Sequence, residues 1–103
     1  MASANVVDNS DHSRFDLLVD DKPAGLVAYS RRGDNIELVH TEVDPAYEGH
    51  GYGSLLARSA LDAARAEGLR VWPLCPFIQS FLKQHPEYLD LVPQTQVTRF
   101  KLA

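Results

Sequence analysis

A strand that runs into a glycine-rich loop and then into a helix is the feature that most constrains the fold of this chain. It spans residues 40–54, with the sequence HTEVDPAYEGHGYGS. Pro45 ends the strand because proline lacks a backbone donor, and an alanine- and leucine-rich helix is expected from about Ser54. Three glycines alternate just before that helix: Gly49, Gly51 and Gly53. Such glycines let backbone N–H groups converge beside the helix's own unpaired N–H groups, so the loop suits a phosphate or pyrophosphate.

A tight strand-to-helix connection without a ligand is the alternative interpretation of these glycines. Two well-known phosphate-binding patterns do not fit them. The dinucleotide-binding fingerprint needs G-x-G-x-x-G and a second βαβ half, whereas the spacing here is G-x-G-x-G in a chain of 103 residues. The P-loop needs a lysine before its Ser or Thr, but Gly53 precedes Ser54. The sequence pattern alone therefore leaves the type of phosphate site open.

Three strands joined by short polar turns are expected before the loop. Alternating apolar residues predict these strands over residues 14–19, 24–31 and 36–43. The segments between them are rich in Asp, Pro, Gly and Asn, which favour turns. Consecutive strands with such short connections form an antiparallel meander.

A strand–helix–strand unit is expected to follow the meander. An apolar stripe predicts a helix over residues 54–67, which Gly68 ends. The apolar segment 69–74 then has the pattern of a buried strand. A connection of this length favours parallel pairing between residues 36–43 and 69–74 with a right-handed crossover. The fold class is therefore α/β with α+β character.

The C-terminal third is expected to be mainly helical. A second helix is predicted from Pro76 to about Gln84, since the residue before Pro86 avoids the helical region. Residues 88–92 fit a short helical turn, and residues 96–102 fit either a last strand or a helical tail.

Composition indicates one globular domain with an N-terminal tail. A chain of 103 residues has room for one hydrophobic core, and 45% hydrophobic and 23% charged residues are ordinary for such a domain. Residues 1–13 are polar and lack periodicity. We therefore expect a flexible tail over residues 1–13 and a single domain over residues 14–103.

The net charge and the single cysteine limit which binding partners and which cellular compartment are expected for this protein. A net charge of −4 argues against nucleic acid or an anionic membrane surface as the main partner. No apolar run approaches the length of a membrane span, and the N-terminus lacks the features of a secretory signal. One cysteine cannot form an internal disulfide, so a cytoplasmic location is expected. No metal site is expected, and exposed strand edges leave a monomer or a homodimer open.

The glycine loop and its flanks resemble the acyl-CoA-binding signature of the GNAT superfamily of N-acetyltransferases. The matching stretch is VDPAYEGHGYGSLLARSAL, residues 43–61. The family pattern is Arg/Gln-x-x-Gly-x-Gly/Ala after a V-x-P turn, and Gly51 and Gly53 match its two small positions. Glu48 departs from the pattern, because it stands where the family usually has Arg or Gln.

A later stretch of the sequence makes the resemblance more specific, because it points to one subfamily. Residues 71–92, VWPLCPFIQSFLKQHPEYLDLV, resemble a subfamily of very short GNAT-like proteins that carry a Cys-Pro-Phe motif. The resemblance covers roughly residues 15–92 and implies a minimal GNAT fold, in which strands 36–43 and 69–74 splay apart around an acyl-pantetheine arm. It also implies acetyl-CoA as cofactor and an unidentified amine as acceptor. The cofactor-binding residues that it implies are Val43, Gly49, His50, Gly51, Tyr52, Gly53 and Ser54.

Cys75 is the candidate nucleophile. It ends the predicted strand 69–74, and Pro76 occupies the expected first position of the next helix. A helix N-terminus stabilises a thiolate, which is the strongest nucleophile that this chain offers. The resemblance implies that Cys75 lies near the thioester and accepts the acyl group. A small buried residue that fills a strand end is the alternative.

His40 is the candidate base. An imidazole can take a proton near neutral pH from an amine or from Cys75. Glu42 has the parity of His40 along the strand, so both side chains should point to the same face, where the carboxylate could orient His40 or act as a base through water. A histidine that merely packs on the sheet is the alternative. The tyrosine that most GNAT enzymes use as general acid falls near Phe81 or Leu82, and Tyr88 is the nearest substitute.

Two functions from different classes follow. The first is an acetyl-CoA-dependent N-acyltransferase that acts directly or through an acyl-Cys75 intermediate. The second is a non-catalytic or self-acylating CoA-binding module. The second stays open because so short a chain has no room for the helices that often form the acceptor wall in GNAT enzymes.

Overall fold

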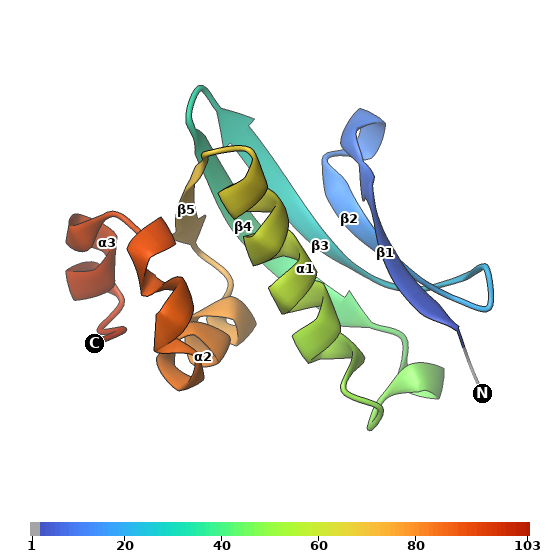
Figure 1. Ribbon diagram of the computed structural model, residues 1–103. Helices are drawn as coiled ribbons and strands as arrows, with labels where there is room; N and C mark the ends of the chain where they lie inside the picture. The colour runs from blue at the N-terminus through green and yellow to red at the C-terminus, as the bar shows by residue number, and fades with distance from the viewer. Residues whose placement is uncertain (1–2) are drawn as a thin grey trace.

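The computed structural model describes residues 3–103 and places five strands in one sheet (Figure 1). In chain order and in space they are β1 (Ala4–Asn9), β2 (Arg14–Val19), β3 (Lys22–Arg32), β4 (Asn35–Val43) and β5 (Arg70–Pro73). The first four strands pair antiparallel, and β5 pairs parallel to β4. The turn between β2 and β3 holds Asp20 and Asp21 at positive φ, a conformation that Asp tolerates and that matches the strand twist.

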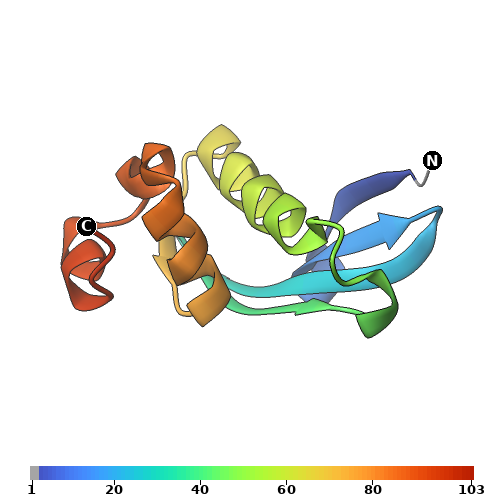
Figure 2. The same ribbon diagram turned by 90° about the horizontal axis from the view of Figure 1, so that it is seen from below.

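Three α-helices pack on or beside this sheet. They are α1 (Tyr52–Ala66), α2 (Pro76–Gln84) and α3 (Gln94–Arg99). Short 3₁₀ helices cover Ser10–His12, Pro45–Tyr47 and Pro86–Leu91. Figure 2 shows α1 lying across one face of the sheet, with α2 beside it near the β5 end. In the part of the chain that the structure describes, no helix crosses the opposite face, which we call the open face.

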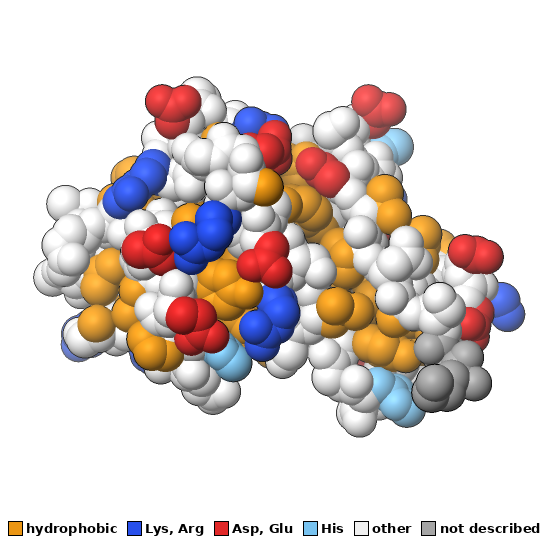
Figure 3. Space-filling model, in the orientation of Figure 1, with side chains coloured by type: hydrophobic (Ala, Val, Ile, Leu, Met, Phe, Trp, Pro, Cys, Tyr) orange, Lys and Arg blue, Asp and Glu red, His pale blue; other side chains and the backbone are white. Residues whose placement is uncertain are grey.

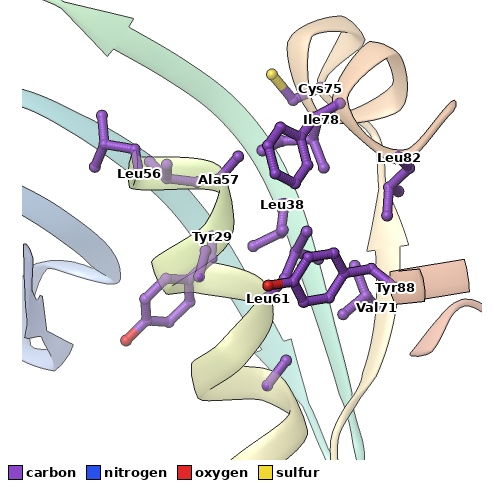
Figure 4. Close-up of a cluster of buried hydrophobic side chains, with 14 of the residues drawn as sticks. Tyr29, Leu38, Leu56, Ala57, Leu61, Val71, Cys75, Ile78, Leu82 and Tyr88 are labelled. Carbon is purple, nitrogen blue, oxygen red and sulfur yellow. The ribbon is translucent and has the colours of Figure 1, made fainter. Parts of the chain in front are cut away.

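The hydrophobic core lies between α1, α2 and the covered face of the sheet. Alternate residues of β2 are buried there, as strand geometry requires: Phe15, Leu17 and Val19. Figure 4 shows side chains of α1 and α2 converging on Leu38 of β4 and Val71 of β5, and both are fully buried. Each buried aliphatic side chain contributes about 1.5–3 kcal/mol, so this cluster fixes both helices against the parallel strand pair.

The strand–helix–strand unit expected from the sequence is present. The parallel pairing of β4 with β5 is confirmed, and the second helix has its predicted bounds, Pro76–Gln84. The first helix begins at Tyr52, two residues before the predicted Ser54. The C-terminal segment, for which the sequence fitted either a strand or a helix, is helical over Gln94–Arg99.

The prediction of a flexible tail over residues 1–13 is wrong for the part that the structure describes. Backbone pairing with β2 makes residues 4–9 the strand β1. This strand shows no alternation of apolar residues because several of its side chains are polar, and these side chains form hydrogen bonds. The Tyr29 hydroxyl donates to Asp8 at 2.6 Å, and Asn9 donates to Asp16 at 2.9 Å. The first two residues lie outside the described part.

Candidate functional site

A β-bulge interrupts β4 just where the candidate site begins. Tyr29 pairs with Leu38 and Ala28 pairs with His40, so Val39 is an extra residue on β4. A bulge bends its strand and increases the local twist. It also reverses the alternation of side chains: Leu38 points into the core, whereas His40 faces solvent.

His40 and Glu42 lie together on the open face. Their Nε2 and Oε1 atoms are 3.4 Å apart, and the two side chains are 60% and 61% exposed. The sequence prediction that they share a face is therefore met. An imidazole held beside a carboxylate can accept a proton from a reacting group.

The parallel strands β4 and β5 separate after four paired positions. Their pairing runs from Asn35 with Arg70 to Leu38 with Pro73, while β4 continues to Val43. The last backbone contact between β4 and the segment after β5 is a hydrogen bond from the Cys75 N–H to the Leu38 carbonyl, at 2.9 Å. Beyond it the chain enters α2, so residues 39–43 of β4 have no paired strand on that side. We call this place, where the unpaired end of β4 faces the start of α2, the splay.

Cys75 lies at the mouth of the splay. It is the N-cap of α2, with Pro76 at the first helical position, and it is 3% exposed. Its Sγ lies 3.4 Å from the hydroxyl oxygen of Thr41 on β4. Figure 4 shows the sulfur pointing away from the aliphatic cluster, on the side of β4. Cys75 therefore faces Thr41 at the point where the pairing of β4 with β5 ends.

Sequence reasoning did not select Thr41 as a site residue. The only indication in the sequence was its place next to His40, because adjacent residues of a strand point to opposite faces. The bulge at Val39 turns this opposite side toward the splay, and a bulge leaves no mark in the apolar pattern.

The glycine loop forms the N-terminus of α1. Gly49 has a φ of 83° and Gly51 a φ of 76°, in the left-handed region that favours glycine. Gly51 is the N-cap of α1, and the first intrahelical hydrogen bond runs from Leu55 N–H to its carbonyl. The N–H groups of Tyr52, Gly53 and Ser54 therefore have no partner within the helix and can bind an anion. Glu48, at the position usually held by Arg or Gln, is exposed.

Aromatic side chains surround this loop. The ring centroid of Tyr52 lies 6.5 Å from that of Tyr47 and 5.6 Å from that of His50. Gly53 has a different role from Gly51, because it faces Phe77 of α2. A β-carbon at position 53 would lie 2.9 Å from Cζ of that ring. Gly53 thus permits the close approach of α1 and α2.

Tyr88, the suggested substitute for the usual general acid, lies at the other end of α2 from Cys75 (Figure 4). It is buried, and its hydroxyl donates to Asp62 of α1 at 2.8 Å. Burial raises its pKa. Tyr88 therefore ties the segment after α2 to α1, and the structure does not bring it to the splay.

Charged and aromatic groups gather around this contact. The guanidinium of Arg58 lies 5.6 Å from the Phe81 ring centroid, and the His85 ring stacks on the Phe81 ring with the two centroids 4.2 Å apart. Arg65 binds both carboxylate oxygens of Asp90, at 2.8 and 2.9 Å. Figure 3 shows acidic, basic and histidine side chains intermixed on this side of the molecule. These opposite charges compensate one another.

A hollow of about 360 Å³ lies at the ends of β2, β3 and β4. Its lining includes Asp16, Leu26, Glu42 and Asp44. It therefore borders the His40–Glu42 pair rather than Cys75. Among residues 3–103, no three His, Cys, Asp or Glu side chains are grouped as metal ligands. In the same part of the chain, none of the helices combines the length and apolar character needed to span a membrane.

Comparison with known proteins gives relatives over most of this domain. The family model described as GCN5-related N-acetyl-transferase matches residues 14–91. Protein NATD1 of Bos taurus is 44% identical over 57 residues, which are 53% of this chain and 50% of that protein. Protein NATD1 of Danio rerio is 39% identical over 59 residues, or 55% and 54% of the two chains. The chain thus spans about half the length of the curated relatives it matches.

A solved structure matches the fold. It is N-acetylglutamate synthase from Neisseria gonorrhoeae, in complex with coenzyme A and N-acetyl-glutamate. The TM-score is 0.52 at 25% identity, and the match covers 60% of this chain and 16% of that chain.

Proposed function

The chain belongs to the GCN5-related N-acetyltransferase family, and we propose that it transfers an acetyl group from acetyl-CoA to an amine through a thioester on Cys75. The resemblance to this family in the sequence is confirmed by the family match. Membership of the short subfamily with a Cys-Pro-Phe motif stays a prediction, as do the substrates.

The loop and the splay support binding of acetyl-CoA. The pyrophosphate would bind the free N–H groups at the start of α1, beside Gly49 and Gly51, where the helix dipole favours negative charge. The pantetheine arm would follow the edge of β4 beyond Leu38, up to Val43, where pairing with β5 has ended. The solved relative that shares this fold was bound to coenzyme A.

The position of Cys75 carries the proposal for chemistry. Its sulfur, as the thiolate, attacks the acetyl carbonyl carbon, a new C–S bond forms, and the bond to the sulfur of CoA breaks. CoA leaves as a thiolate that takes up a proton. An amine then attacks the Cys75 thioester and the cysteine sulfur leaves. The proton of the amine passes by way of water to His40, which lies on the other face of β4 and which Glu42 orients.

Intact-protein mass spectrometry after incubation with acetyl-CoA tests this route. We expect a single acetyl adduct on the wild type and none on Cys75→Ala. Addition of small primary amines should then remove the adduct and yield acetylated amine. An adduct that persists in Cys75→Ala would refute the thioester route, and failure of CoA to bind in calorimetry would refute the whole assignment.

A self-acylating CoA-binding module is the second candidate. The exposure of His40 and Glu42 on the open face favours it, because no described element forms an acceptor wall there. In this case the acetyl group would accumulate on Cys75 and stay there after any amine is added. The same experiment therefore separates the two functions.

A further inference from the structure

The hydroxyl of Thr41 takes no part in the steps proposed for acetyl transfer, yet it is the side-chain group that contacts the Cys75 sulfur. Oγ1 and Sγ are 3.4 Å apart, and either atom can donate. Thr41 lies on β4 beyond Leu38, whose carbonyl accepts the last backbone hydrogen bond, from Cys75. The contact is therefore made by side chains where backbone pairing has already ended.

We propose that Thr41 is a positioning residue that holds the Cys75 sulfur inside the splay. This inference rests on the proposed acetylation of Cys75. Two contacts from β4 then fix the cysteine: the Leu38 carbonyl binds its backbone N–H at 2.9 Å, and Thr41 binds its sulfur. The two β4 residues lie on either side of the bulge at Val39, which turns the Thr41 side chain toward the sulfur.

The hydroxyl suits both states of the sulfur. The thiol donates its proton to Oγ1, whereas the thiolate accepts the hydroxyl proton. Thr41 keeps its own proton throughout and acts as neither acid nor base. A hydrogen bond to an ionised group is about twice as strong as a neutral one. Thr41 therefore keeps its contact with the sulfur in both states and orients it.

Alkylation of Cys75 by iodoacetamide tests this role without acetyl-CoA. Thr41→Val keeps the shape of the side chain and removes the hydroxyl, and we expect alkylation to slow about threefold to tenfold. Thr41→Ser keeps the hydroxyl and should restore most of the rate. Thr98→Val is the matched control, because Thr98 is exposed on α3. Thermal unfolding of each variant verifies that it is folded.

The direction of the change separates positioning from packing. If Thr41 only filled space, its replacement would loosen the site and make the sulfur more accessible, so alkylation would be unchanged or faster. Either result would overturn the inference. Failure of Thr41→Ser to restore the rate lost in Thr41→Val would also overturn it, since serine keeps the hydroxyl that the inference requires.

Acetylation at saturating acetyl-CoA provides the second readout. We expect Thr41→Val to lower the rate constant for acetylation of Cys75 by a similar factor, with the half-saturating acetyl-CoA concentration unchanged. Normal acetylation of Thr41→Val would refute the role of Thr41 and leave the proposed function standing. Slower alkylation of Thr41→Val combined with no acetylation of the wild type would instead refute the proposed function alone.

Discussion

Gly53 lies so close to Phe77 that a β-carbon on the glycine would be 2.9 Å from the end of the ring. Phe77 is 41% exposed, so its ring can move aside. Gly51, two residues earlier, has open space around it but a φ of 76°. The two family glycines therefore differ in physical role: Gly53 lets a movable side chain pack closely, whereas Gly51 adopts a backbone conformation that favours glycine.

This difference predicts a larger loss of stability for Gly51→Ala than for Gly53→Ala. Gly51→Ala should lower the free energy of unfolding by about 1–2 kcal/mol, because a left-handed φ strains a residue with a β-carbon. Gly53→Ala should change it by less than about 1 kcal/mol, because better helix propensity offsets displacement of the ring. Urea denaturation measures both. The explanation fails if Gly53→Ala is the more damaging change, or if Phe77→Ala does not alter its effect.

The hydrogen bond from Tyr29 to Asp8 predicts a loss of stability at alkaline pH. Burial and the bond to Asp8 raise the pKa of Tyr29 from 10.0 to about 12. Because the folded state holds this proton more tightly than the unfolded state, the contribution is complete below pH 10 and is lost as pH rises toward 12. Tyr29→Phe should remove that alkaline loss and cost about 1 kcal/mol at neutral pH.

Two measurements check the Tyr29 prediction. Urea denaturation between pH 7 and about 12 gives the pH dependence, and absorbance of the phenolate follows the titration itself. Tyr47→Phe is the matched control. Because burial also raises the pKa of Tyr88, the decisive result is the stability: an alkaline loss of stability that survives unchanged in Tyr29→Phe would assign it to another group.

Loss of the His40 imidazole should affect only the second half of acetyl transfer. His40 lies on the open face beside Glu42, whereas Cys75 faces the splay. In His40→Gln, acetylation of Cys75 should continue, but transfer to an amine should slow about a hundredfold. Single-turnover mass spectrometry with pre-acetylated protein measures that step. Equal slowing of both steps, or of neither, would contradict a base that acts on the amine.

The sequence predicts regular elements of this fold well and its irregular ones poorly, for physical reasons. Pro76 and Gly68 are local signals, so the helix boundaries that they set appear where expected. The bulge at Val39 has no local signal, since an apolar residue in a β-rich stretch fits a regular strand equally well. The contact between Thr41 and Cys75 depends on that bulge, and it becomes visible only in three dimensions.

Deletion of Val39 tests whether the bulge creates the splay. Without Val39, β4 would alternate regularly: Leu38 inward, His40 outward and Thr41 inward, with the same partners on β3. The fold should therefore survive, with equal or higher thermal stability. The bend that separates β4 from β5 should be lost, however, because a bulge bends its strand and increases its twist.

The functional effect of this deletion should be large. Misplacement of reacting groups by about 1 Å can slow a reaction a hundredfold, so acetylation of Cys75 should fall by about that factor. Calorimetry should also show weaker binding of CoA, because the arm can no longer enter between the strands. Val39→Ala keeps the bulge and serves as the control. Acetylation of the deletion variant at the wild-type rate would show that the splay does not depend on the extra residue, and that the early divergence of β5 into α2 opens it instead.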